Sequence, residues 1–345
     1  MRRTTRAVVL GCVGALALTV AGQAFAAYTP RIAAWTSGAS TTIAFTAPST
    51  DDPTARLQFL VPSGFTANLG SAGQTIGTVD AKTAAADLGG ATLPLTGTLQ
   101  ARAAAGTYLS SGVNVPLAAA STACTGTASH TAFWVLILSA AGQTLEVPIF
   151  VDAGPPGGPA YILTICLPPP DLPPGNPARA AFGAKLFDAA LKLNGIFTAP
   201  AGDRRWKLIA TPYTPLIGMV NALGTVETQS IDSGSGTATL AAKRAAAKRA
   251  AVSGHVARGG AGLAGVPVQI RLGARVLATV KTDASGNFKA TVKLPTLAAT
   301  LTARAVVGTR DLGASACTAT SPPVPCIGAT SPGFTATSKS VRVKT

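Results

Sequence analysis

The side chains best suited to acid–base chemistry are few in this sequence and far apart. Only two histidines occur, His130 and His255, and more than 120 positions separate them. Glycoside hydrolysis needs two carboxyl groups that face each other across a cleft. The candidates for such a pair are Asp51, Asp52, Asp152, Asp188, Asp203 and Glu227.

Turn chemistry explains most of these acidic residues better than catalysis does. Asp51-Asp52-Pro53 and Gly202-Asp203 are typical turn sequences, in which aspartate hydrogen-bonds the local backbone. Asp51 and Asp52 are also an alternative ligand pair for Ca²⁺. No nucleophile elbow, zinc-protease motif or phosphate-binding loop occurs. We therefore expect no enzyme activity, no catalytic residue, no cofactor and no metal, with an extracellular hydrolase as the remote alternative.

The cysteines favour disulfide chemistry. Beyond residue 26 the chain holds Cys124, Cys166, Cys317 and Cys326. Four cysteines allow three pairings, and proximity in sequence favours Cys124 with Cys166 and Cys317 with Cys326. A zinc site needs closely spaced ligand pairs, and only Cys317 and Cys326 are near each other. We therefore expect two disulfides, which form in oxidising compartments outside the cytosol.

The first 26 residues have the pattern of a cleavable secretory signal peptide. Arg2, Arg3 and Arg6 precede an apolar run over residues 7–20, and Ala24-Phe25-Ala26 supplies small residues before the cleavage point. Cleavage after Ala26 removes the fifth cysteine, which lies within the signal.

Other interpretations of this segment fit less well. A transmembrane anchor requires about 20 apolar residues, whereas Gly22 and Gln23 interrupt the run. Arg2-Arg3 is compatible with a twin-arginine signal. Lipidation at Cys12 leaves the longer apolar stretch behind it without a role. We predict a secreted, extracellular protein without a transmembrane span, or one loosely associated with the cell wall.

Period-two alternation of apolar residues predicts strands through most of the mature chain. Apolar residues make up 47% of the chain and charged residues 12%, a balance typical of folded proteins. Two apolar runs, 133–138 and 145–151, flank a glycine-containing turn and predict a hairpin. Further strands are expected over residues 41–46, 55–61, 161–167, 186–198 and 206–210. The proline-rich segment 168–177 is expected to be a loop in the first domain, with a domain boundary as the alternative.

A Gly/Ser linker at residues 233–236 predicts a boundary between a first domain, residues 27–232, and a second domain, residues 237–345. In the second, Asp283 is expected to hydrogen-bond a turn, Gly286 to take positive φ and Phe288 to return to the core. Ser253-Gly254-His255-Val256, Leu263 to Ile270 and Thr282 to Phe288 resemble bacterial immunoglobulin-like and carboxypeptidase-regulatory-like (transthyretin-like) modules.

These resemblances imply a fold more than a function. The modules are β-sandwiches that serve as spacers, stalks or adhesive accessories, and the stretch from Cys317 to Cys326 departs from them as an inserted, stapled loop. Residues 51–57 and 213–215 resemble exported actinobacterial proteins. The fold class expected is all-β, with two antiparallel, immunoglobulin-like β-sandwich domains after a signal peptide.

Charge is divided unevenly between the two parts. Residues 27–234 hold 10 Lys and Arg against 11 Asp and Glu, whereas residues 235–345 hold 15 against 2. Such an excess attracts polyanions, and the candidate residues are Lys243, Arg244, Lys248 and Arg249. Because Ala, Lys and Arg favour helices, a helix is an alternative there to the preferred basic linker. The other interpretation of the charge is a solvated surface that keeps the protein soluble.

Because the protein is expected to be exported, the expected partner is an anionic cell-wall polymer or a glycan. Nucleic acid is the least favoured ligand, since the basic strands lack interleaved aromatic residues. Trp35 and Trp206 are candidates for stacking on sugar rings, whereas Trp134 alternates with Leu136 and is expected in the core. We therefore expect a non-enzymatic structural or binding protein, associated with the cell envelope through its basic part. The alternative is a carbohydrate- or protein-binding, adhesin-like first domain with the second as spacer.

Overall fold

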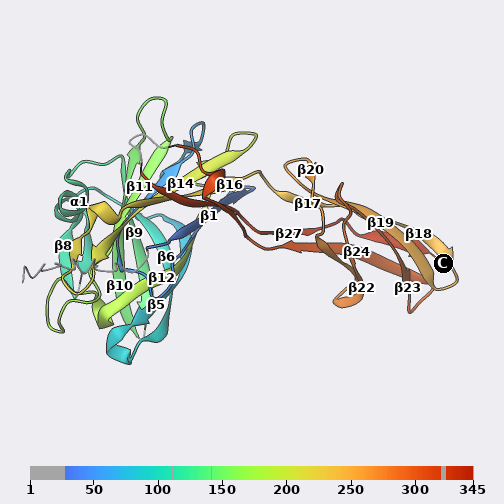
Figure 1. Ribbon diagram of the computed structural model, residues 1–345, viewed down its shortest axis with the longest axis horizontal. Helices are drawn as coiled ribbons and strands as arrows, with labels where there is room; N and C mark the ends of the chain where they lie inside the picture. The colour runs from blue at the N-terminus through green and yellow to red at the C-terminus, as the bar shows by residue number, and fades with distance from the viewer. Residues whose placement is uncertain (1–27, 111, 141, 320–323, 345) are drawn as a thin grey trace, which may run out of the picture.

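The computed structural model describes residues 28–110, 112–140, 142–319 and 324–344. The predicted signal peptide therefore lies outside the described residues. Strands dominate, and they gather into two bodies placed end to end (Figure 1). We call residues 28–232 with 310–331 the first body, and residues 236–307 with 334–344 the second body. The prediction of an all-β protein is confirmed.

One large mixed sheet makes up most of the first body. Its 14 strands follow the order β1-β2-β12-β5-β6-β9-β10-β11-β3-β14-β16-β26-β25, with β15 paired to β14. The strands of this body are β1 (Arg31–Ser37), β2 (Ser40–Thr46), β3 (Thr54–Val61), β4 (Thr66–Ala67), β5 (Thr75–Ala85), β6 (Ala91–Arg102), β7 (Thr107–Ser110), β8 (Val113–Pro116), β9 (Ala132–Ala140), β10 (Gln143–Ala153), β11 (Tyr161–Cys166), β12 (Ala184–Asn194), β13 (Phe197–Thr198), β14 (Arg204–Thr214), β15 (Met219–Val220), β16 (Val226–Asp232), β25 (Arg310–Gly313) and β26 (Cys326–Ser331).

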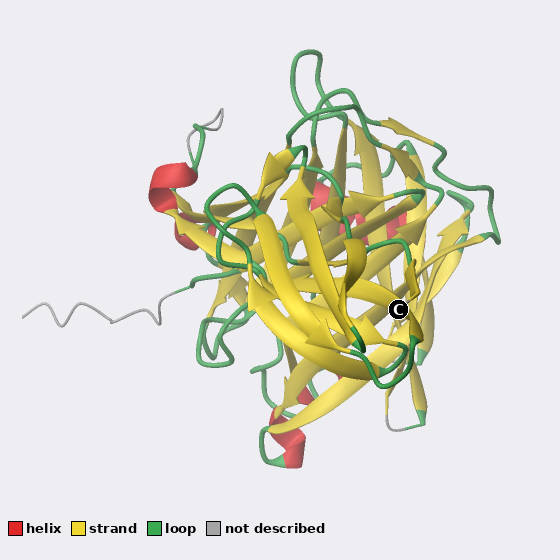
Figure 2. Cartoon of the chain, turned by 90° about the vertical axis from the view of Figure 1, so that its right-hand side faces the viewer, coloured by secondary structure: helices red, strands yellow, loops and turns green. Residues whose placement is uncertain are grey.

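Helical segments are short and lie between these strands (Figure 2). They are α1 (Leu117–Thr125) and the 3-10 turns η1 (Ala86–Leu88), η2 (Ala181–Gly183), η3 (Ala222–Gly224) and η4 (Ala314–Ala316). No helix in the described part of the chain is long and apolar enough to cross a membrane.

The sheet curls until its two ends meet. The Ala34 backbone N–H in β1 donates to Ser230 Oγ in β16 at 2.9 Å, and Thr330 Oγ1 in β26 donates to the Ile32 carbonyl. Side chains therefore close a gap that backbone hydrogen bonds do not bridge. The first body is thus one curled sheet, where the sequence had predicted two facing ones. Its β16–β26 pair is parallel, which departs from the purely antiparallel arrangement expected.

Aromatic side chains fill the half of the curled sheet nearest the second body. The Phe65 ring lies edge-on to Trp206 and to Phe197, with ring centroids 5.3 and 6.3 Å apart, and Phe197 lies 6.5 Å from Trp134. Strands β9 and β14 begin at this end, so Trp134 and Trp206 lie near the starts of their strands. The packed half anchors the sheet.

Helix α1 covers part of the sheet's outer face. Leu117 packs there against Phe133, Val135 and Phe150. The Cys124–Cys166 disulfide then links the end of α1 to the end of β11. Both disulfides, this one and Cys317–Cys326, join the cysteines that proximity had favoured.

The second body consists of two five-stranded sheets that enclose a core of small apolar residues, among them Val256, Val268 and Leu301. Its strands are β17 (Gly236–Ala238), β18 (Ala241–Ala246), β19 (Arg249–Arg258), β20 (Ala261–Gly262), β21 (Pro267–Leu272), β22 (Arg275–Lys281), β23 (Asn287–Lys293), β24 (Ala298–Val307), β27 (Phe334–Thr337) and β28 (Val341–Lys344).

Two local predictions for this body have different outcomes. At the expected hairpin, Asp283 Oδ1 accepts the backbone N–H groups of Ser285 and Asn287, Gly286 has φ of 82°, and Phe288 is buried. That prediction is confirmed. The prediction of a basic linker from Lys243 to Arg249 was wrong, because β18 pairs antiparallel with β19 there.

The chain passes between the two bodies three times. After β16 it enters the second body, it leaves after β24 to form β25 and β26 on the first body's sheet, and it returns at β27. The stretch expected as a stapled loop, Cys317 to Cys326, leads into β26, which joins the first body's sheet by pairing with β16. Three crossings restrain the bodies more than one flexible linker does.

Candidate ligand cavity

The half of the curled sheet farthest from the second body encloses a cavity of about 580 Å³. Inward-facing apolar side chains from many strands line it. They include Phe45, Leu57, Phe59, Val79, Ala81, Leu95, Leu138, Val147, Ile165, Ala189 and Leu191. Its size and apolar lining are typical of a small-molecule site.

The sequence explains why this half is hollow. At the packed end, Trp134, Phe197 and Trp206 fill the space between opposing strands. At the hollow end, the inward positions of neighbouring strands β5 and β12 include Ala81 and Ala189, which are paired in register. Small side chains there leave space that the aromatic residues fill elsewhere.

The cavity also reaches the side of the sheet beside α1. Strand β11 ends at Cys166, whereas its neighbour β10 begins at Gln143 and pairs with β11 only from Ile149 onward. Among the described residues, no strand pairs with residues 143–148 of β10 on that side. Ala120, Ala123 and Tyr108, from α1 and β7, line the cavity there. The Cys124–Cys166 disulfide thus fixes the helix that covers this gap.

Lys185 and Tyr213 are polar residues that line the cavity, and Asp51 lies beside Lys185. Lys185 Nζ donates to the backbone carbonyls of Ser49, at 2.8 Å, and Asp51, and burial lowers the pKa of this lysine. Asp51 Oδ2 accepts from Thr29, from the backbone N–H at 2.5 Å and from Oγ1 at 3.0 Å. Tyr213 Oη donates to the Leu167 carbonyl at 2.6 Å. These groups are satisfied by the protein itself.

Asp52 differs from these neighbours. It is 4% exposed, and its Oδ1 is buried with no hydrogen-bond partner among the described residues. Burial raises the pKa of its carboxyl, and the positive charge of Lys185 opposes that shift. The described residues contain no cluster of three or more His, Cys, Asp and Glu side chains able to hold a metal ion. Asp51, meanwhile, has Thr29 as the partner of its Oδ2, so the two carboxyls expected for Ca²⁺ have unlike environments.

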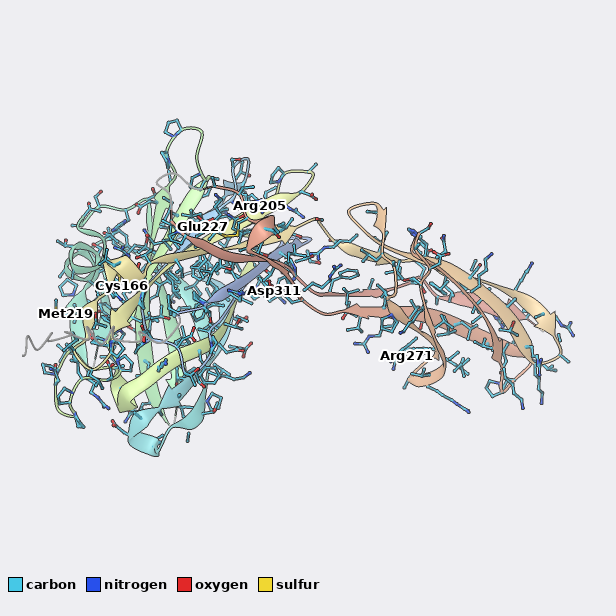
Figure 3. The ribbon with its side chains drawn as sticks, viewed as in Figure 1. Cys166, Arg205, Met219, Glu227, Arg271 and Asp311 are labelled. Carbon is cyan, nitrogen blue, oxygen red and sulfur yellow. A yellow bond between two sulfur atoms is a disulfide. The ribbon has the colours of Figure 1, made fainter. Side chains whose placement is uncertain are left out.

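A strongly apolar loop borders the same opening. Leu216, Ile217, Met219, Val220 and Leu223 are exposed by 78, 56, 66, 55 and 101%. Val220 also lines the cavity. We call residues 215–223 the apolar loop; Figure 3 shows its Met219 at the end of the first body farthest from Arg271 on the second body.

The tryptophans expected to stack on sugars have unequal surroundings. Trp206 is 0% exposed, and Phe65 and Phe197 lie edge-on to its ring, so it offers no face to a sugar. Trp35 is half-buried on β1. Trp134 is fully buried, as predicted, and its indole N–H donates to the Leu69 carbonyl at 2.9 Å.

The basic residues expected to bind polyanions lie together at the far tip of the second body (Figure 1). Lys243 and Arg244 are in β18, Lys248 is in the turn with φ of 53°, and Arg249 opens β19. All four are exposed. Arg249 lies opposite Lys293 of β23 in register, which extends the positive surface.

The acidic candidates for hydrolysis have separate partners. Asp188 pairs with Lys82 at 3.7 Å, and Asp152 accepts from His130. Glu227 is fully buried in β16, where Gln229 Nε2 donates to its Oε1 and Lys207 Nζ lies 3.8 Å away. Because these carboxyl groups lie on different strands and have separate partners, no two of them face each other across the cavity.

One arrangement resembles a catalytic relay. His130 Nδ1 lies 2.9 Å from both carboxylate oxygens of Asp152, and its Nε2 lies 3.2 Å from Thr125 Oγ1. However, Thr125 Oγ1 donates to the Ser121 carbonyl at 2.9 Å, at the carbonyl-rich end of α1. The described N–H groups of Gly126 and Thr127 at that end donate to the Thr122 carbonyl and to Thr125 Oγ1, so neither is available to stabilise an oxyanion. The arrangement ties α1 to β10, with the His130 ring stacked on Phe150.

Comparison of the chain with protein-family models, curated proteins and solved structures finds no match. The site therefore rests on its own geometry. Sequence reasoning missed both the cavity and the apolar loop. The sequence does contain a signal for the loop. Pro215 and Gly218 mark a turn, where charged residues are common, yet residues 208–226 contain no charged side chain.

Proposed function

We propose that this chain is an exported, non-enzymatic binding protein whose first body holds an elongated apolar molecule of the acyl-chain class. The observation that supports this proposal is the cavity of about 580 Å³, lined by inward apolar side chains. Each methylene group buried there contributes about 0.8 kcal/mol to binding. The two disulfides fit an extracellular protein.

The polar groups at the opening limit the ligand's chemistry. Of the polar side chains that line the cavity, Lys185 and Tyr213 have partners within the protein. A head group gains little by competing with the bonds of these two side chains, whereas a hydrocarbon chain replaces water in the apolar part. Hydrophobic burial therefore supplies most of the binding free energy.

The test is titration of the full chain with a fluorescent fatty acid in solution without vesicles. We expect saturable binding of one probe per chain, with emission typical of an apolar environment. Competition by unlabelled acyl chains should strengthen with chain length. The absence of saturable binding contradicts the proposal.

A second candidate function is supported by the charge of the second body. We infer that it is an immunoglobulin-like β-sandwich that associates with an anionic envelope polymer. Lys243, Arg244, Lys248 and Arg249 are exposed at its tip, away from the first body. Contacts between these side chains and a polyanion release counterions, so binding weakens steeply with salt.

The matched variants for this second function are Lys248→Gln with Arg249→Gln, and Lys82→Gln with Lys192→Gln on the first body. Co-sedimentation of the full chain with purified anionic wall polymer is measured over a salt series. We expect the tip variant to bind more weakly and to show a shallower salt dependence. Equal retention of both variants contradicts the assignment.

A further inference from the structure

The apolar loop gathers most of the exposed apolar surface in one place. Five of the ten large apolar side chains that are exposed in the described part of the chain belong to residues 216–223. Contiguous exposed apolar surface of this kind marks an interaction site. The remaining five are scattered over other elements.

The loop is built to keep these side chains outward. Leu216 has φ of 67°, which is unfavourable for a residue with a branched side chain. The Asp171 carboxylate holds it there by accepting the Leu216 backbone N–H at 2.6 Å. At the other end of the loop, Asn221 Oδ1 accepts the Gly224 N–H at 3.1 Å and caps η3. Strain held by specific bonds is typical of functional segments.

The loop and the cavity form one continuous apolar surface. β15 pairs with the end of β14 through Tyr213 and Val220, and both residues also line the cavity. A molecule leaving the cavity past Val220 therefore meets Met219 and its exposed neighbours. The loop therefore borders the cavity on the side that Tyr213 and Val220 line.

We propose that the apolar loop inserts into the surface of a lipid bilayer, so that an acyl chain passes between bilayer and cavity without crossing water. This proposal rests on the proposed function of the cavity. Residues 208–226 contain no charged side chain, which fits insertion among acyl chains because a charge there is costly. The Asp171 carboxylate beside the loop accepts the Leu216 N–H. Met219 of the loop lies at one end of the molecule (Figure 3), and β18 of the basic tip lies at the other (Figure 1).

The experiment measures flotation of the full chain with vesicles of pure phosphatidylcholine, whose neutral surface removes attraction to the basic tip. The loop variant is Leu216→Asp with Met219→Asp. The matched control is Val276→Asp with Val306→Asp, two residues of the second body that are 43 and 46% exposed. We expect the loop variant to reduce the bound fraction about tenfold or more, and the control to leave it unchanged.

A second measurement does not depend on the aspartate variants. Leu223 is fully exposed, so Leu223→Trp places an indole on the loop without disturbing the core. Brominated phosphatidylcholine should quench this added fluorescence and leave the emission of the wild-type chain unchanged. Absence of quenching, or equal flotation of the loop variant and the wild type, overturns the proposal.

Binding of the fluorescent fatty acid in solution separates the two proposals. If the loop variant retains solution binding but loses flotation, both proposals are supported. If the wild type binds the probe but does not float, insertion of the apolar loop into the bilayer is overturned, while the proposed function of the cavity stands. If the wild type floats but binds no probe, the proposed function fails, and transfer into the cavity fails with it.

Discussion

The Arg258 guanidinium and the Asp232 carboxylate meet in the junction between the two bodies, with Nη2 and Oδ1 3.5 Å apart and both residues buried. Arg258 also donates to the carbonyls of Gly234 and Pro332 and to Ser331 Oγ. It lies over the Phe334 ring, 5.6 Å from its centroid. One side chain from β19 thus contacts two of the three crossings between the bodies.

Replacement of Arg258 should loosen the junction. Arg258→Met keeps an apolar stem but leaves Asp232 without one of its two cations, although Arg204 remains 3.0 Å away. We expect a loss of about 3 kcal/mol in the free energy of unfolding, because removal of one partner of a buried pair is costly. X-ray scattering should also show a broader distribution of interbody distances.

Arg271→Met is the matched control for this measurement. Arg271 is half-buried in β21, and its guanidinium donates to the nearby Ala274 carbonyl at 3.0 Å. Its replacement should change the free energy of unfolding by about 0.5 kcal/mol or less. Equal effects of the two methionine variants contradict the role given to Arg258.

Filling the cavity should abolish ligand binding without unfolding the chain. Ala81→Phe places a ring inside the cavity, because Ala81 lines it from β5. We expect affinity for the fluorescent fatty acid to fall at least tenfold. The free energy of unfolding should change by about 1 kcal/mol or less, since the ring occupies space that is already there.

The control lies on the same strand and faces the other way. Thr78 is exposed on β5, so Thr78→Phe adds the same ring outside the cavity. It should leave probe affinity unchanged in the same titration. A fall in affinity for both variants points to a general disturbance of β5 instead of a blocked cavity.

Sequence reasoning succeeded where neighbouring residues determine the structure. Alternation over residues 133–151 predicted the β9–β10 hairpin, and Asp283 with Gly286 predicted a turn with its hydrogen bonds. Disulfide pairing followed from proximity. Each of these features depends on contacts between segments close together in the chain.

The missed features depend on distant segments. β16 contains Glu227, Gln229 and Asp232, which resemble an exposed strand in sequence but are fully buried. Their partners come from far away: the Thr36 N–H donates to Asp232, and the Thr318 N–H donates to Gln229. The cavity likewise depends on Ala81 and Ala189 meeting across two strands, which local alternation cannot reveal.

The two disulfides should differ in their contribution to stability. Their cysteines are 42 and 9 positions apart, and the longer loop restricts the unfolded chain more. Loop entropy predicts about 4 kcal/mol for Cys124–Cys166 and about 3 kcal/mol for Cys317–Cys326. Double serine variants of each pair, compared by chemical denaturation, should show the larger loss for Cys124–Cys166.

Probe binding should separate the two pairs further. Loss of Cys124–Cys166 frees the end of α1 that covers the side of the cavity, so probe affinity should fall. Loss of Cys317–Cys326 affects the segment before β26, away from the cavity lining, and should leave affinity unchanged. Equal affinities for both double variants contradict the role of α1 as a cover.

Asp283 should make the stability of the second body depend on pH at the acidic end. The Asn287 N–H holds the pKa of this carboxyl below its usual value of 3.8, and the Ser285 N–H adds to the effect. A carboxyl with a lowered folded pKa stabilises the fold fully above its unfolded pKa. That stabilisation disappears as pH falls through the folded pKa. Asp283→Ala should therefore melt a few degrees below the wild type at neutral pH, and the difference should shrink toward about pH 2.

Asp283→Asn distinguishes the charge from the acceptor geometry. The asparagine oxygen still accepts both backbone N–H groups, but the side chain does not titrate in this range. This variant should melt between the wild type and Asp283→Ala at neutral pH, and its gap to the alanine variant should not depend on pH. Thermal melting followed by circular dichroism across the acidic range measures both gaps. If the difference in melting temperature between the wild type and Asp283→Ala stays constant down to about pH 2, the Asp283 charge contributes nothing to the turn.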